Sequence, residues 1–282
     1  MTAVSAPRVS TRDVVKYVIL GLFALPWVVL PLWFLVVNSF KSQEEASRPS
    51  IGLPTHWQAI ENYTTVLFEG DYLVGLKNSL IVVIPVVAAV LVLGAMAAWV
   101  FARSSSMTFR VFYYVLSLSV ILPPAIVPTV VMITKAGLTG SLLGYILALV
   151  GTRVGIIVFL TTGYVRTLPT DFEEAAQLDG ANRWQMFWRV VLPLLAPVLF
   201  TAAVMTVINV WNDFFFALYM TKGAANATIP LTLYSFANDG IYGLRWNLVF
   251  AQVVLSALPL LVAYVLMQRR ILSGLTDGGV TG

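Results

Sequence analysis

The chain has 282 residues, of which 59% are hydrophobic and only 11% are charged. Soluble domains carry about 25% charged residues, so this composition excludes an ordinary soluble protein and indicates a polytopic membrane protein. The net charge of +4 comes from dispersed basic residues, which form no stripe for nucleic acid, and the absence of cysteine excludes disulfides and thiol chemistry.

The first apolar run, residues 17–37, follows the basic residues Arg8, Arg12 and Lys16. It is too long for the core of a cleaved signal peptide, and no small-x-small cleavage site follows it. We therefore expect residues 1–16 to form a cytoplasmic segment and the run to form the first spanning helix.

Five further apolar runs have, fully or nearly, the length of about 20 residues that a helix needs to cross a bilayer. The helices are predicted at residues 17–37, 78–102, 111–134, 142–165, 194–221 and 246–268, with a polar loop at 166–193 and a tail at 269–282. The sequence therefore predicts an all-α membrane domain of six transmembrane helices over residues 17–268.

Basic residues indicate the orientation, because cytoplasmic loops carry an excess of Lys and Arg. Ten lie on the side of the termini: Arg8, Arg12, Lys16, Arg103, Arg110, Arg166, Arg183, Arg189, Arg269 and Arg270. Six lie on the other side: Lys41, Arg48, Lys77, Lys135, Lys222 and Arg245. We expect both termini to be cytoplasmic, and the loops 38–77 and 221–245 either to meet a soluble partner outside or simply to connect helices.

Two charged residues, Arg153 and Asp213, fall inside predicted spans. A charge there costs about 2.5–3.5 kcal/mol on insertion scales and usually faces a bundle interior or water. With Asn209 and Asn212 they are candidates for a transport pathway or a partner-facing surface, and the alternative is that Arg153 and Asp213 pair as structural elements. The prolines Pro123, Pro124 and Pro128 indicate either an irregular pathway helix or simple packing kinks.

The polar loop reads as a short amphipathic helix outside the bilayer. Helix starts after Pro169, and Thr170 with Glu173 predicts a capping box. The acids Asp171, Glu173 and Glu174 would lie in the first turn, where the helix dipole favours negative charge, and Gly180 would end or bend the helix. From these residues alone an ordinary loop helix remains equally open.

The same loop carries a long pattern: Glu174-Ala175-Ala176, three residues, Gly180, nine residues, Val190, one residue, and Leu192-Pro193. It resembles the signature loop of the membrane subunits of bacterial ABC importers, with Val190 where the family has Ile. Ser39-Phe40-Lys41, Trp211-Asn212-Asp213-Phe214 and the glycine-rich end 274–282 extend the resemblance over residues 12–282, to the smaller permease of the maltose-type carbohydrate importers. Asp277 and Thr281 depart from that family's terminus.

The resemblance implies a type I ABC importer fold in the bacterial cytoplasmic membrane. It implies a heterodimer with a second permease, an ATPase dimer that binds ATP and Mg, an extracytoplasmic solute-binding protein and a carbohydrate substrate. It assigns ATPase coupling to Glu173, Glu174, Ala175, Ala176, Asp179, Gly180 and Arg183. It assigns contact between the tail and the ATPase to Gly274, Leu275, Thr276, Gly278 and Gly279.

The sequence contains no G-x-x-x-x-G-K-[ST] phosphate loop, no metal-ligand cluster and no credible catalytic dyad or triad, so we expect a permease that is no enzyme itself. Two other functions stay open. An ion-coupled secondary transporter usually carries several intramembrane acids and an internal repeat, whereas here only Asp213 qualifies. A non-transporting membrane scaffold would need neither the acid-rich helix nor kinked spans.

Overall fold

The computed structural model describes residues 11–238 and 244–277. These residues form helices and no β-strand, apart from one isolated bridge between Gly140 and Thr221, which confirms the all-α prediction. The chain divides into two compact units, residues 1–70 with 236–257, and residues 71–235 with 258–282.

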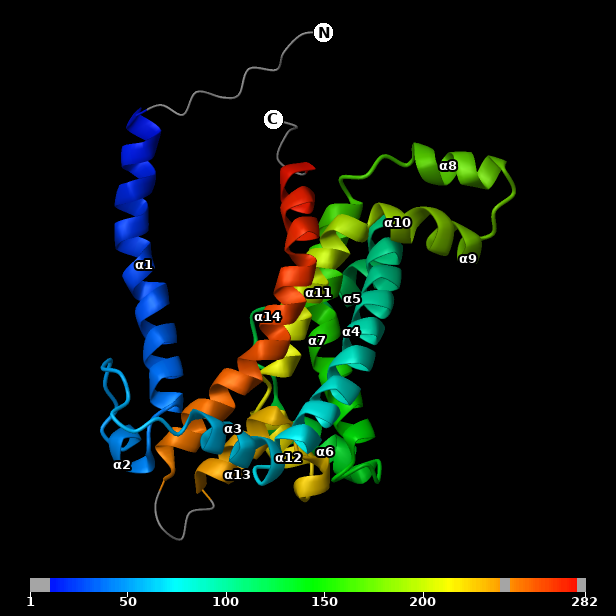
Figure 1. The fold of residues 1–282 in the computed structure, drawn as a ribbon. Helices are drawn as coiled ribbons and strands as arrows, with labels where there is room; N and C mark the ends of the chain where they lie inside the picture. The colour runs from blue at the N-terminus through cyan, green and yellow to red at the C-terminus, as the bar shows by residue number, and fades with distance from the viewer. Residues whose placement is uncertain (1–10, 239–243, 278–282) are drawn as a thin grey trace. The chain divides into compact units, whose positions relative to one another are not determined.

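Figure 1 labels the helices in chain order. They are α1 Thr11–Ser39, α2 Gln43–Ala46, α3 Ala59–Phe68, α4 Tyr72–Arg103, α5 Met107–Leu118, α6 Ile126–Lys135, α7 Leu142–Val165, α8 Asp171–Leu178, α9 Arg183–Met186, the π-helix η1 Phe187–Val191, α10 Leu192–Leu194, α11 Ala196–Trp211, α12 Phe215–Met220, the 3-10 helix η2 Ala224–Asn226, α13 Ile229–Asn238 and α14 Trp246–Asp277.

In the first unit, a buried polar network closes the loop after α1. Lys41 is only 2% exposed, and its Nζ donates to Asn38 Oδ1 at 3.1 Å and to the Ser50 carbonyl at 2.9 Å. Asn62 of α3 donates to the carbonyls of Ser39 and Lys41, each at 2.9 Å. Since buried polar groups are costly unless they are hydrogen-bonded, these contacts fix the fold of residues 38–62.

The second unit is built around close packing of α4 and α5 on α7 (Figure 1). A Cβ placed on Gly94 of α4 would lie 2.7 Å from Ile157 Cγ2 of α7. A Cβ on Gly155 of α7 would collide with Ser119 Oγ and lie 2.9 Å from the Leu116 carbonyl. Small residues let membrane helices approach closely, so these two glycines set the distances between the three helices.

The helix predicted at 111–134 is wrong as a continuous element. Residues 119–125 are not helical and separate α5 from α6. Pro123 and Pro124 lack backbone donors, and each restricts the residue before it, so the helix cannot pass through them. Pro128 lies inside α6 without breaking it.

The helix predicted at 194–221 is also broken, between α11 and α12. Asn212 follows α11, and its side chain donates to the Ile208 carbonyl at 2.8 Å, an interaction that competes with helix continuation. At the other end of the chain, α14 runs to Asp277, past the predicted end at 268. Extending an existing helix orders only one further residue for each backbone hydrogen bond gained, so it costs less than starting a new helix. No proline follows Pro259 in the sequence to end α14 earlier.

Within residues 11–238 and 244–277, three helices are long and apolar enough to cross a membrane, namely α4, α7 and the part of α14 from Trp246 to Val265. Two bent pairs pass the same test together: the two parts of α1, bent by 42°, and residues 183–194 with α11, bent by 76°. The described residues therefore contain several apolar spans, as the composition predicted.

Candidate functional site

The polar loop, residues 166–193, contains α8, α9, η1 and α10 and is here called the signature segment. Figure 1 shows α8 beyond the ends of α4 and α7, at the end of the second unit opposite to α6 and α12. The segment thus lies where the spanning helices of this unit end.

The predicted capping box at the start of α8 is wrong. Thr170 has helical backbone angles (φ −77°, ψ −17°), and its side chain makes no capping bond. A capping side chain works from an extended residue, so Thr170 instead accepts through its carbonyl from Glu173 N–H and Glu174 N–H, at 2.8 and 3.0 Å. The three acids do lie in the first turn, as predicted.

The carboxylate of Glu173 does not cap α8 but connects α8 to the end of α4. Its Oε2 accepts from Trp99 Nε1 at 2.9 Å, and its Oε1 accepts from Arg103 Nε at 2.8 Å. Arg103 also donates through Nη2 to the Leu168 carbonyl at 3.0 Å. These charge-assisted bonds tie both the entry to α8 and its first turn to one spanning helix.

Gly180 ends α8 as predicted, by a Schellman-type turn. Its φ is +79°, Ala181 N–H donates to the Ala176 carbonyl at 3.0 Å, and Gly180 N–H donates to the Gln177 carbonyl at 3.1 Å. A true capping box follows at α9, where Asn182 and Gln185 exchange side-chain and backbone bonds at 2.9 and 3.0 Å. The Asn-x-x-Gln spacing was the sequence signal for it.

The Leu192-Pro193 end of the signature makes the corner into α11. Pro193 has no N–H to offer the Arg189 carbonyl, and the preceding residues adopt a π-helix in which Leu192 N–H bonds to the Phe187 carbonyl. After Leu195 the chain turns by 76° into α11. Phe187, Val191 and Leu195 anchor this corner in a buried apolar cluster with residues of α4 and α7.

The predicted coupling residues divide into two groups by their surroundings. Glu173 and Ala176 are half-buried, and Ala176 packs against the apolar cluster. The others are exposed: Glu174, Ala175, Asp179, Gly180 and Arg183. Sequence reasoning missed three exposed apolar side chains beside them, Phe172, Leu178 and Trp184, with exposed fractions of 53%, 89% and 60%. The sequence could have indicated them, because a large apolar side chain in a polar segment outside the bilayer has no lipid to contact.

A groove of about 920 Å³ separates the signature segment from the end of α4 and the start of α5. Gln177 of α8 lines it, together with Arg103 and Arg183. Glu173 of α8 also lines this groove, whereas Glu174 does not. The groove therefore lies on the side of α8 that faces the rest of its own chain.

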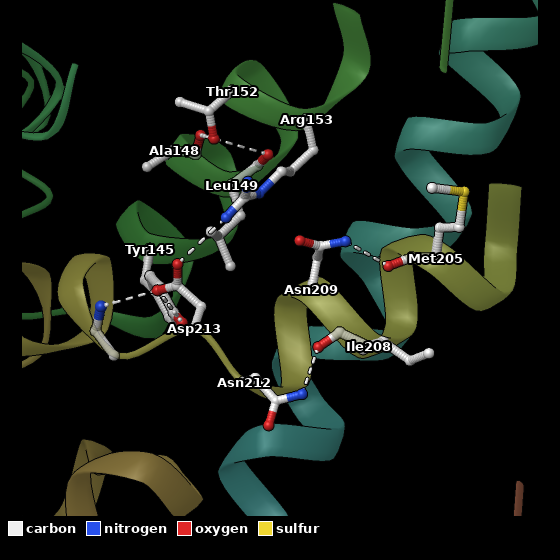
Figure 2. Close-up of polar contacts among 11 residues, drawn as sticks. Tyr145, Ala148, Leu149, Thr152, Arg153, Met205, Ile208, Asn209, Asn212 and Asp213 are labelled. Carbon is white, nitrogen blue, oxygen red and sulfur yellow. Dashed lines mark hydrogen bonds and ion pairs between the residues drawn. The ribbon is translucent and has the colours of Figure 1, made fainter. Parts of the chain in front are cut away.

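A second polar cluster lies among α7, α11 and α12 (Figure 2). Arg153 Nη2 and Asp213 Oδ2 form an ion pair at 3.4 Å, the pairing that was one of the two interpretations of these charges. Tyr145, which sequence reasoning missed, donates to Asp213 Oδ1 at 3.0 Å, and Ala217 N–H donates to the same oxygen at 3.3 Å. Asp213 thereby joins α7 to the α11–α12 break.

Among the remaining predicted residues, Asn209 lies near this pair, because it lines one small cavity together with Arg153. Asn209 and Asn212 are exposed on or just after α11. Gly274, Leu275 and Thr276 belong to the helical backbone of α14, whereas Gly278 and Gly279 lie outside the described residues. Residues 11–238 and 244–277 contain no group of three or more side chains suited to hold a metal ion.

Residues 90–276 match the sequence family described as the binding-protein-dependent transport system inner membrane component. The chain belongs to this family. The matched region runs from the middle of α4 through the signature segment to α14, so it includes the bridge from Glu173 to Arg103 and the Arg153–Asp213 ion pair. This membrane component is an inner-membrane, multi-pass permease and is not itself catalytic.

The sequence of this permease aligns with those of known relatives over nearly its whole length. It is 30% identical over 253 residues to the diacetylchitobiose uptake system permease protein NgcG of Streptomyces coelicolor, covering 89% of this chain and 83% of the relative. It is 28% identical over 265 residues to the probable starch degradation products transport system permease protein AmyC of Thermoanaerobacterium thermosulfurigenes, covering 91% and 93%.

The fold also matches a solved structure, that of a bacterial ABC transporter involved in the import of the acidic polysaccharide alginate. The TM-score is 0.76 at 23% identity, over 94% of this chain and 99% of the other. The permease therefore has the fold of an ABC importer membrane subunit.

Proposed function

We propose that this permease forms the translocation pathway for a di- or oligosaccharide, or a related glycerol-phosphate compound, in a binding-protein-dependent ABC importer. The relatives named for diacetylchitobiose and for starch degradation products support a carbohydrate, because both align over about nine-tenths of this chain. In this proposal the partners are a second homologous permease, an ATPase dimer that binds ATP and Mg, and an extracytoplasmic solute-binding protein.

The proposed topology has six spans with both termini in the cytoplasm. The spans are α1, α4, the broken pair α5 and α6, α7, the broken pair α11 and α12, and the part of α14 up to residue 268. Proline and asparagine breaks inside spans are tolerated where neighbouring helices or a water-filled cavity satisfy the freed backbone groups. Residues 166–193 and the tail 269–282 then lie on the cytoplasmic side, by the excess of basic residues there.

The observation that carries the coupling role is the division of α8 into two faces. Glu173 and Ala176 hold the helix to its own permease, and the exposed Glu174, Ala175 and Asp179 are left for an ATPase cleft. Arg183, at the start of α9, lines the groove but is also exposed, and it is proposed as a further contact. The exposed Phe172 and Leu178 add apolar contact area of the kind that interfaces bury. The tail residues Gly274, Leu275, Thr276, Gly278 and Gly279 are proposed as a second contact with the ATPase.

Because the chain has no cysteine, a single introduced cysteine reports on one position of this permease. Ala175 and Ala176 are neighbours in α8 with different surroundings, because Ala175 is exposed and Ala176 packs on the apolar cluster. In the assembled complex we expect crosslinks to the ATPase from Ala175→Cys and few or none from Ala176→Cys. Equal crosslinking, or none from either position in any nucleotide state, contradicts the docking face.

A charge reversal tests the coupling itself. Glu174→Lys should abolish most uptake and most ATP hydrolysis stimulated by loaded binding protein, while insertion into the membrane stays normal. The matched control is Gln177→Lys, one turn further along α8, which is exposed like Glu174 but lines the groove toward α4 and should keep most of the uptake. If both variants retain wild-type uptake, α8 does not couple this permease to an ATPase.

A further inference from the structure

A groove lies between the signature segment and the turn from α4 to α5, beside the docking face of α8 rather than on it. Its volume of about 920 Å³ is within the range of about 300–1,000 Å³ of sites that hold small molecules. Figure 1 shows α8 and α9 at the end of the second unit where α4 ends. In the proposed topology this end meets the cytoplasmic face of the membrane, so the groove lies at the level of the lipid headgroups.

The groove carries one unbalanced positive charge. Three charged side chains line it, those of Arg103, Glu173 and Arg183. Arg103 and Glu173 form an ion pair at 2.8 Å, so their charges offset each other. The guanidinium of Arg183 is exposed and makes no hydrogen bond or ion pair with residues 11–238 or 244–277. Because a guanidinium presents five donors in a planar fork that matches a phosphate, Arg183 is available for an anionic group.

Hydroxyl groups of the turn from α4 to α5 line the same groove. They belong to Ser104 and Ser105. The Oγ of Ser104 accepts from Ser106 N–H at 3.2 Å, which leaves its hydroxyl hydrogen available to donate. The first turn of α5, which starts directly after this turn, contains no acidic residue, so no carboxylate there repels an anion. These donors suit the oxygens of a phosphate group.

Apolar side chains also line the groove, and they continue along α5. Val100 and Phe109 line it and are partly exposed. Phe112 is exposed as well, and it lies on the same helix face as Phe109 because it follows three residues later. With Met107 and Val111 it lines a shallow hollow of about 310 Å³ on α5. A free phosphate ion makes no use of such a surface, whereas an acyl chain is stabilised by it.

We propose that this groove binds the headgroup of an anionic phospholipid of the cytoplasmic leaflet. Arg183 contacts the phosphate, the two serines donate to its oxygens, and an acyl chain follows Phe109 and Phe112 along α5. Basic pockets between spanning helices on the cytoplasmic side suit such headgroups. The site rests on the proposed topology but not on the proposed substrate.

A bound lipid would also have a structural effect on the signature segment. Arg183 belongs to α9, whereas Ser104 and Ser105 belong to the turn between α4 and α5. A phosphate held by both sides would therefore join the signature segment to the spanning helices a second time, beside the bridge that Glu173 makes to Arg103.

Native mass spectrometry of the purified permease–ATPase complex measures the binding directly. Three probes distinguish the sources of the phosphate: phosphatidylglycerol, phosphatidylcholine with the same acyl chains but no net charge, and inorganic phosphate. Wild type should retain phosphatidylglycerol about fivefold better than phosphatidylcholine, the effect of one basic residue beside an anionic headgroup. Millimolar inorganic phosphate should not displace the lipid, because it lacks the acyl chains.

Substitutions at exposed positions assign the binding to the groove. Arg183→Gln should lower the retention of phosphatidylglycerol about fivefold and leave that of phosphatidylcholine within about twofold. Ser105→Glu, which places a carboxylate in the groove, should lower it by a similar factor. The matched control is Arg189→Gln, since Arg189 is an exposed arginine of the same segment that does not line the groove, and it should bind as wild type.

Hydrogen exchange in nanodiscs tests the structural effect. In nanodiscs that contain phosphatidylglycerol, amides of residues 178–186 of the wild-type complex should exchange about threefold or more slowly than in phosphatidylcholine alone, because a ligand stabilises the state that binds it. This difference should disappear in Arg183→Gln and persist in Arg189→Gln.

The site is overturned by equal retention of the two lipids in wild type, or by equal retention of phosphatidylglycerol in wild type and Arg183→Gln. Displacement by inorganic phosphate would make it a site for a free anion, and equal losses in Arg183→Gln and Arg189→Gln would reduce it to general surface charge. Loss of the ATPase from Arg183→Gln would assign this arginine to the ATPase interface instead. The proposed function is judged separately, by the uptake and the stimulated ATP hydrolysis of Glu174→Lys.

Discussion

Glu173 should matter for a reason different from that of its neighbour Glu174. Glu173 binds Trp99 and Arg103 of its own chain, whereas the side chain of Glu174 is exposed and makes no hydrogen bond or ion pair with the residues that the structure describes. Glu173→Ala therefore removes the bridge between α8 and α4, and Glu174→Ala removes only a group available to a partner. The two variants change adjacent carboxylates and form a matched pair.

The magnitude follows from the exposure of the bridge. A buried hydrogen bond to a charged group contributes about 1.5–3 kcal/mol, and an exposed ion pair contributes about 0.2–1 kcal/mol. The side chains of Arg103 and Glu173 are 23% and 17% exposed, so we take about 1 kcal/mol for each of the two bonds, an intermediate value. Losing both weakens the docking of α8 by about 2 kcal/mol, or roughly 30-fold.

Hydrogen exchange on the nucleotide-free complex measures this docking directly. In Glu173→Ala, amides of residues 171–178 should exchange about 30-fold faster, since local opening sets their protection. In Glu174→Ala the same amides should exchange within about threefold of wild type, while contact with the ATPase weakens. Unchanged exchange in Glu173→Ala, or equal acceleration in both variants, refutes the reasoning that Glu173 acts through α4.

Three further predictions follow from the packing and the proposed topology. Gly155→Val should impair folding of the permease, because its side chain would collide with Ser119 and approach the Leu116 carbonyl, whereas Gly163→Val on the same helix has nothing within 4 Å and should be tolerated; yields of monodisperse protein compare them. Gly180→Ala should loosen the end of α8 by about 1 kcal/mol, because a side chain is strained at φ +79°, and exchange at Gln177 to Ala181 measures the effect. A cysteine at Ser105 should react with a membrane-impermeant maleimide only in inverted vesicles and one at Ala225 only in intact spheroplasts, and labelling from the same side contradicts the proposed topology.

Much of the local structure was accessible from sequence because it depends on neighbours in the chain. The Pro169 start and the Gly180 end of α8 were predicted from backbone restrictions that any fold must obey. The break at Pro123 and Pro124 obeys the same restrictions, and the error was to treat one apolar run as one helix. The capping box at Thr170 failed because Glu173 found stronger donors in α4, 74 and 70 residues away in the chain, than the backbone amide beside it.

The sequence by itself determined the membrane class, through the scarcity of charge, and the family, through the spacing of the signature from Glu174 to Pro193. It also placed Arg153 and Asp213 in apolar spans. Only the tertiary structure decided that these two charges pair, that Tyr145 holds the carboxylate, and that Glu173 turns inward while Glu174 stays exposed. Periodicity and turn chemistry act over a few residues, whereas the partner of a buried polar group depends on which helices pack together, and here α4 and α7 meet segments about 60 to 75 residues away.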